Sequence, residues 1–348
     1  MKKLIFISSN IIYKKDLDKL GLKFLSKKFK IILISFKKFK IEKTRTNSNI
    51  KFINESNFVK IKKILNNNDI FGLVDLMFPS INSYLIKRYA SNKKIKLIKL
   101  NNSVFPAKKR NIKEKLLLNF NIFNPQREKI ITKIFNHLYL YINSFVDYDY
   151  IFICRKADKI LKNSKKTTLI KCHGFDYDKF LDLKNKSKNI LNKIVYIDND
   201  WLNHPDYKIH NANYKIDKIN FKKKMNYFFD LIEKKFNKDI LIAANPKSNR
   251  YKIKSLFNNR KTYQNKTLEL INNCSCVIAT KSTALSFAVL LSKPIIFITF
   301  DDVIGNELGN GIENQSSLLG KRAINIDRNF LINKKEFTFI NKKKYKYY

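Results

Sequence analysis

Short continuous apolar runs alternate with amphipathic stretches through the first half of the chain. The run at 4–8 is typical of a parallel strand buried on both faces, and a helical pattern over 16–28 separates it from a second run at 30–36. Strand, helix and strand in this order begin a doubly wound sheet. The same patterns predict further strands at 70–76, 95–100, 149–154 and 168–172, a helix at 80–91, and a long helical stretch at 112–143 with a break near Pro125.

A second series of strands and helices follows the polar stretch 182–193. Its pattern predicts strands at 194–198, 239–244, 276–279 and 294–299, and helices at 221–236, 267–272 and 282–291. Strands that alternate with helices indicate a second parallel sheet. We therefore predict an α/β fold of two Rossmann-like doubly wound parallel-sheet domains that face each other across a cleft, over 1–175 and 190–330, with a C-terminal tail at 331–348. Ligands of such sheets bind beyond the carboxyl ends of the strands.

The net charge of +43 comes from 71 Lys and Arg against 28 Asp and Glu. Lysines are spread along the whole chain. Arginine, which makes bidentate contacts to phosphate and guanine, is scarce. Genome bias toward AT-rich codons explains this composition better than a polyanion site, so nucleic acid is not a predicted partner. The excess charge still favours peripheral contact with an anionic membrane. A non-enzymatic polyanion-binding protein stays open as an alternative.

Four cysteines occur, and two of them form the pair Cys274-x-Cys276 on a predicted strand. Alternation along a strand directs these two sulfurs to opposite faces, and no second pair stands at zinc-finger spacing, so no metal site is predicted. Buried, small apolar side chains in a reducing cytoplasm explain the cysteines better. The longest apolar stretch, 283–300, is interrupted by Lys293-Pro294 and is short for a bilayer span. With no signal peptide in the N-terminal pattern, we predict a cytoplasmic protein.

Two polar turns follow strands of the second predicted sheet. Ser282 and Thr283 come after the strand at 276–279, at the start of a predicted helix, where free backbone N–H groups and the helix dipole favour an anion such as phosphate. An ordinary helix cap is the alternative. The turn Asn245-Pro246-Lys247-Ser248 ends another strand, one strand over, and offers a cation and hydrogen-bonding groups; a plain strand-to-helix turn is its alternative.

Candidate acids and bases cluster in two further segments. The segment at 198–207 combines carboxylates, the single Trp and a histidine, a mixture that suits a sugar, and His204 and Asp206 are its candidate bases. His173 and Asp176 lie just before the predicted linker and are the other candidates. A solvated loop and an interdomain hinge are the respective alternatives.

These pieces in this order resemble a known group of enzymes. The NPKS turn at 245–248, followed by KTYQNKTLELINNCSCVIATKSTALSFAVLLSKPIIFIT at 261–299, is similar to the C-terminal half of GT-B glycosyltransferases of bacterial capsule and surface-polysaccharide biosynthesis. Families that use CMP-sugars share this layout, with a His-Pro turn and a Ser-Ser/Thr turn that hold the nucleotide. The segments YKKDLDKLGLKFL at 13–25 and HPDY at 204–207 add to the resemblance.

The resemblance implies an acceptor-side N-terminal domain and a C-terminal domain that binds a nucleotide-sugar. It implies that Ser282 and Thr283 hold the phosphates, that Pro246, Lys247 and Ser248 line the nucleoside, and that Glu269 contacts the ribose. The reaction would be a metal-independent sugar transfer from a nucleotide-sugar to a surface-polysaccharide or lipid-linked glycan acceptor, with no cofactor besides this substrate. Asn245 replaces the expected histidine, which leaves an inactive transferase open, beside a sugar-nucleotide 2-epimerase or a polyol-phosphate transferase.

Overall fold

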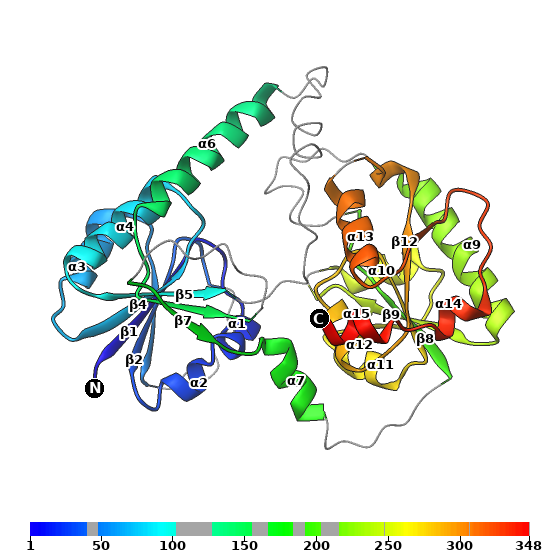
Figure 1. The fold of residues 1–348 in the computed structure, drawn as a ribbon, viewed down its shortest axis with the longest axis horizontal. Coiled ribbons are helices and arrows are strands. Elements are labelled where there is room, and N and C mark those ends of the chain that lie inside the picture. The colour runs from blue at the N-terminus through cyan, green and yellow to red at the C-terminus, as the bar shows by residue number, and fades with distance from the viewer. Residues whose placement is uncertain are drawn as a thin grey trace. The chain divides into compact units, whose positions relative to one another are not determined.

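The computed structural model describes residues 1–39, 48–101, 127–154, 166–183, 192–202, 216–246, 248–305 and 307–347. These residues form two compact units, and the chain passes from the first to the second between Phe175 and Asp176. Figure 1 shows that each unit is a parallel sheet with helices packed against it. No helix in the described ranges is long and apolar enough to cross a bilayer.

The N-terminal unit is built on a seven-stranded sheet in the order β3-β2-β1-β4-β5-β6-β7, in which every pair of neighbours is parallel. Its strands are β1 (Lys3–Ser8), β2 (Lys30–Ser35), β3 (Ile50–Asn54), β4 (Ile70–Leu76), β5 (Lys96–Asn101), β6 (Tyr150–Ile153) and β7 (Thr168–Lys171). Its helices are α1 (Lys14–Lys19), α2 (Leu22–Leu25), α3 (Phe58–Leu65), α4 (Ile81–Asn92) and α6 (Arg127–Ser144), and α7 (Phe175–Leu183) follows at the unit boundary. Separate apolar clusters cover the two faces of the sheet, which explains the continuous apolar runs.

The C-terminal unit holds a six-stranded parallel sheet in the order β10-β9-β8-β11-β12-β13. Its strands are β8 (Lys193–Ile197), β9 (Asp239–Ala244), β10 (Thr262–Gln264), β11 (Cys276–Ala279), β12 (Ile295–Thr299) and β13 (Ala323–Asn325). Its helices are α9 (Lys218–Phe236), α10 (Arg250–Leu256), α11 (Thr267–Asn273), α12 (Leu285–Leu290), the short η2 (Asp301–Val303), α13 (Glu307–Leu318), α14 (Lys334–Thr338) and α15 (Lys342–Tyr347). The predicted class of two Rossmann-like parallel sheets is confirmed.

The observed helices differ from the predicted ones at three places. The helix predicted over 16–28 is interrupted, because Gly21 has a φ of 63°, a left-handed conformation that ends one helix before α2 begins. Part of the predicted linker forms α7 (Phe175–Leu183). The helix predicted to begin at Ser282 begins at Leu285, and a turn occupies the residues between them.

Candidate functional site

The loop that follows β8 links the carboxyl ends of several strands in the C-terminal unit. The indole Nε1–H of Trp201 donates to Thr280 Oγ1 at 2.9 Å, and the side-chain amide of Asn199 donates to the same oxygen at 3.3 Å. Thr280 directly follows β11, so these bonds join the ends of two neighbouring strands. The Trp201 ring also packs edge-on against Phe300, which follows β12, with 5.3 Å between the ring centroids. The loop is therefore held in place by buried aromatic and polar contacts.

The same loop reaches the turn that follows β9. Ser248 Oγ donates to Asp200 Oδ2 at 2.7 Å, while the Gln264 side-chain amide, at the end of β10, donates to the Ser248 carbonyl at 2.7 Å. Asp200 has a φ of 54°, and its backbone N–H donates to Asp198 Oδ1 at 3.0 Å. Because β8 lies between β9 and β11, the Asn245 turn and the Ser282 turn are two strands apart, and the prediction of one strand was wrong. The β8 loop fills the space between them.

Asp198 is a buried carboxylic acid at the end of the central strand β8. Only 3% of its surface is exposed, and its Oδ2 atom has no hydrogen-bond partner among the described residues. Burial raises the pKa of Asp198 to about 7, and the nearby Asp200 carboxylate adds to the rise, against the backbone N–H groups of Asp200 and Asn245. A carboxyl group with a pKa near 7 can donate or accept a proton at neutral pH.

The turn after β11 places Ser282 and Thr283 beside α13. The Ser282 backbone N–H donates to the buried Gln315 side chain at 3.0 Å, and the Ser282 hydroxyl accepts from the Ala284 N–H at 3.2 Å. The Thr283 side chain is exposed. Ser282 thus caps a turn rather than the helix itself, since α12 begins three residues later.

Lys281 precedes this turn and lies across α13 at Gly311. A Cβ at Gly311 would stand 2.5 Å from Lys281 Cδ and 2.9 Å from its Nζ, so only glycine leaves room for the lysine in this position. The ammonium group is thereby kept close to the Ser282 turn. Hydroxyls, backbone amides and a cation at one sheet edge suit a phosphate-bearing ligand.

The structure brings some of the predicted site residues together and separates others. Asn245, Pro246, Ser248, Ser282 and Thr283 all follow strands of the C-terminal sheet. Glu269 lies in the first turn of α11 with an exposed side chain. Lys247, His204 and Asp206 lie outside the described residues.

The other two predicted bases lie near the boundary of the units. His173 is exposed and follows β7 of the N-terminal unit. Asp176 lies in the first turn of α7, where its Oδ2 accepts a hydrogen bond of 2.5 Å from Ser286 on α12. This contact gives Asp176 a role in attaching α7 to the C-terminal unit.

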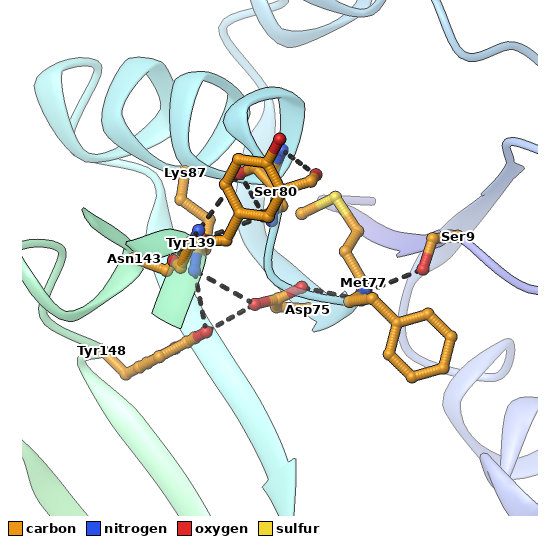
Figure 2. Close-up of polar contacts among 10 residues, drawn as sticks. Ser9, Asp75, Met77, Ser80, Lys87, Tyr139, Asn143 and Tyr148 are labelled. Carbon is orange, nitrogen blue, oxygen red and sulfur yellow. Dashed lines mark hydrogen bonds and ion pairs between the residues drawn. The ribbon is translucent and has the colours of Figure 1, made fainter. Parts of the chain in front are cut away.

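A second polar cluster lies in the N-terminal unit, where β4 ends beneath α4 (Figure 2). Asp75 accepts a hydrogen bond of 2.5 Å from Tyr148 Oη and forms an ion pair of 3.7 Å with Lys87 on α4. Its other oxygen accepts from the Met77 backbone N–H at 2.9 Å. The Lys87 and Asp75 side chains are 4% and 6% exposed, so this ion pair is almost fully desolvated.

Burial sets the protonation of this cluster. It lowers the pKa of Lys87; Asp75 opposes the change, and the neighbouring Lys99 adds to it. Burial and the Asp75 charge raise the pKa of Tyr148, so the phenol stays protonated and donates to the carboxylate. Every polar atom that Figure 2 joins to Asp75 comes from a different part of the chain, which indicates a structural cluster that fixes α4 to the sheet.

Sequence reasoning missed Asp75, Lys87, Thr280 and Gln315, and it named Asp198 only as part of a longer segment. A usable signal existed for Asp75, a charged residue inside the apolar strand IFGLVDL. Lys87 stands on the buried face of α4, with Ser83, Ile86 and Ala90. The described part of the chain holds no group of three or more His, Cys, Asp or Glu side chains arranged for a metal.

Comparisons with known proteins show the fold and no family. No protein-family model matches the chain, and no curated protein matches it. Among solved structures, the wall teichoic acid polymerase TagF is similar with a TM-score of 0.53 and 12% identity, over 93% of this chain and 76% of TagF. A UDP-GlcNAc 2-epimerase from Methanocaldococcus jannaschii has a TM-score of 0.49 at 13% identity, over 99% of this chain and 98% of its own. MurG from Acinetobacter baumannii has a TM-score of 0.45 at 7% identity, over 94% and 87%.

The likeness to TagF gives the class of the fold: two parallel-sheet α/β domains, as in GT-B enzymes. The similar structures include glycosyltransferases and UDP-GlcNAc 2-epimerases. At these identities the likeness shows the fold alone, because one fold hosts many reactions. The capsule-polysaccharide group stays a prediction.

Proposed function

We propose that the chain is a glycosyltransferase that moves a sugar from a nucleotide-sugar donor to a surface-polysaccharide or lipid-linked glycan acceptor. The observation that carries the proposal is the cluster at the carboxyl ends of β8, β9 and β11, where Asp200, Ser248, Trp201 and Thr280 are joined by hydrogen bonds. Ligands of open parallel sheets bind at this edge. The fold shared with TagF supports the proposal at the level of architecture.

In this proposal the C-terminal unit binds the donor. Ser282 and Thr283 hold the phosphates, and Lys281, positioned over Gly311, joins Lys247 as a cation for the leaving group. Asn245, Pro246 and Ser248 line the nucleoside, and Glu269 contacts the ribose. His204, Asp206 and His173 are the proposed acceptor bases; Asp176 is proposed with them, although Ser286 already binds its carboxylate.

A nucleotide should therefore stabilise the chain. With CMP, CDP or UDP at a hundred times its Kd, the free energy of unfolding should rise by about 2.7 kcal/mol, seen as a higher melting temperature. The double variant Ser282→Ala with Thr283→Ala should lose the shift, because it removes both hydroxyls at the phosphate end.

The matched control is Thr338→Ala on α14, near Ser275 and Pro294 at the opposite edge of the same sheet, which should keep the full shift. No shift with any nucleotide would contradict the proposal. Product analysis with UDP-GlcNAc separates the 2-epimerase alternative, which requires a C2 epimer and no acceptor.

We also propose a cytoplasmic location with peripheral contact to an anionic membrane. The net charge of +43 supports it, as do large apolar side chains exposed along one stripe of α6 at Leu138, Tyr141 and Phe145. These residues are 46%, 62% and 59% exposed and recur at helical spacing. A basic protein with an amphipathic helix binds anionic lipid through both features.

Replacing Leu138, Tyr141 and Phe145 with serine should lower binding to phosphatidylglycerol vesicles about tenfold or more in a sedimentation assay, because about 0.8 kcal/mol is lost per CH2 that no longer enters the bilayer. Serine at Ile219 and Leu331, exposed apolar residues of the other unit, should leave binding unchanged. Equal binding by both variants would contradict the role of α6.

A further inference from the structure

Two thiols face each other at the carboxyl edge of the N-terminal sheet. Cys154 follows β6 and Cys172 follows β7, and their Sγ atoms are 3.6 Å apart. The strands pair in parallel with Ile153 opposite Lys171, so the two cysteines are the next residues in register. The Cys172 backbone N–H donates to the Ile153 carbonyl at 3.0 Å, which continues the ladder to this point. The prediction that the cysteines are buried is wrong for this pair, since Cys154 is half-buried and Cys172 exposed.

We propose that Cys154 and Cys172 form a redox-active dithiol that closes to an intramolecular disulfide by exchange with a small-molecule disulfide. Neighbouring strands lie about 4.8 Å apart, inside the range of about 4.4–6.8 Å that disulfides span between Cα atoms. The sulfurs approach from 3.6 Å to a bond of about 2.05 Å by rotation of their side chains. No rearrangement of the two strands is required.

The exchange balances in two steps. The more exposed Cys172, as a thiolate, attacks one sulfur of the reagent; a mixed disulfide forms, and the other half of the reagent leaves as a thiolate. Cys154, as a thiolate, then attacks the Cys172 sulfur, and the second half of the reagent leaves. The two cysteines lose two electrons, the reagent gains them, and the two cysteine protons end on the released thiols.

The other two cysteines provide an internal comparison. Cys274 and Cys276 are each only 1% exposed. Burial raises the pKa of Cys274 to about 12 and raises the pKa of Cys276 as well. Because the thiolate is the reactive form, these two thiols should not react in the folded chain. They also belong to separate apolar clusters, which keeps their sulfurs apart.

The position of the pair gives the disulfide a structural consequence. β7 is an edge strand that pairs only with β6 in the sheet. A bond at its last position would tie this edge to the sheet, two residues before His173 and Gly174 lead into α7. Oxidation should therefore slow the opening of β7 and leave the C-terminal sheet unaffected.

Incubation of the full chain with glutathione disulfide tests the proposal by intact mass and peptide mapping. The wild-type chain should become lighter by two hydrogen atoms, keep no glutathione, and yield a cross-linked peptide that contains Cys154 and Cys172. The variants Cys154→Ser and Cys172→Ser should instead retain one glutathione on the remaining partner. Cys274→Ala should behave as the wild type. Hydrogen exchange of Thr168–Lys171 should slow at least severalfold after oxidation of the wild type alone.

Three outcomes would overturn the proposal. One is a wild-type chain that keeps two glutathiones or does not react, another is a cross-link that includes Cys274 or Cys276, and the last is unchanged exchange at β7 after the cross-link has formed. Circular dichroism of both serine variants checks that they are folded. If one fails to fold, the mass and the peptide map of the wild type still decide the matter.

Discussion

Between pH 4 and pH 8 the Asp198→Asn variant should gain about 4 kcal/mol in stability relative to the wild type. Burial raises the pKa of Asp198 from 3.8 to about 7, and each pKa unit corresponds to about 1.4 kcal/mol. The unfolded chain releases this proton near pH 4, whereas the folded chain holds it until about pH 7. In that window the folded state binds more protons, so the free energy of unfolding falls as pH rises. Asparagine keeps the shape of the protonated acid and does not titrate.

Urea unfolding followed by the fluorescence of Trp201, the single tryptophan, measures this effect in the C-terminal unit. Trp201 is 4% exposed and lies three residues from Asp198, so its emission should report the loss of this core. Asp182→Asn, whose aspartate side chain is 72% exposed, is the matched control and should leave the pH dependence of the wild type intact. Parallel stability curves for the wild type and Asp198→Asn would contradict a raised pKa.

Replacing Lys87 with methionine should lower the free energy of unfolding of the N-terminal unit by about 3–5 kcal/mol. The substitution keeps most of the apolar volume of the side chain and removes the cation, which leaves the 6% exposed Asp75 carboxylate buried without its ion pair. Tyr148 still donates to Asp75, but a neutral hydrogen bond does not replace the charge.

Denaturant unfolding by circular dichroism, with hydrogen exchange of β4 and β5, measures this loss. Lys60→Met is the matched control, because Lys60 pairs with Glu55 at 3.3 Å while 69% exposed, and it should cost less than about 1 kcal/mol. Adding Asp75→Leu to Lys87→Met should recover much of the stability, since the pair is then replaced by apolar groups. Equal effects of Lys87→Met and Lys60→Met would refute the structural role of the buried pair.

The sequence predicted the fold well where each strand is a continuous apolar run. The strands predicted at 70–76, 239–244 and 276–279 have the bounds of β4, β9 and β11. It missed β3, whose side chains are half-buried or exposed and give no apolar run. It missed the short β10 and β13 because three residues carry little periodicity.

The candidate site was predictable only as a set of strand ends. Parallel strands have their carboxyl ends at one edge, so Asn245, Ser248, Ser282 and Thr283 were expected to lie on one side of the sheet. Which of these turns lie next to each other depends on strand order, and strand order depends on crossovers that local patterns do not encode. The position of β8 between β9 and β11 therefore appeared only in the structure, together with the bonds from Asp200 and Trp201.

The sequence by itself determined two doubly wound parallel sheets and the edge at which a ligand should bind, because hydrophobic periodicity is a local property of the chain. Only the tertiary structure decided which side chains meet. Asp75 contacts Tyr148 across 73 positions, and Cys154 faces Cys172 because two strands pair in one register. Burial, and with it the raised pKa of Asp198, also depends on segments that are distant in sequence. These are non-local quantities, which a reading of spacing along one chain does not contain.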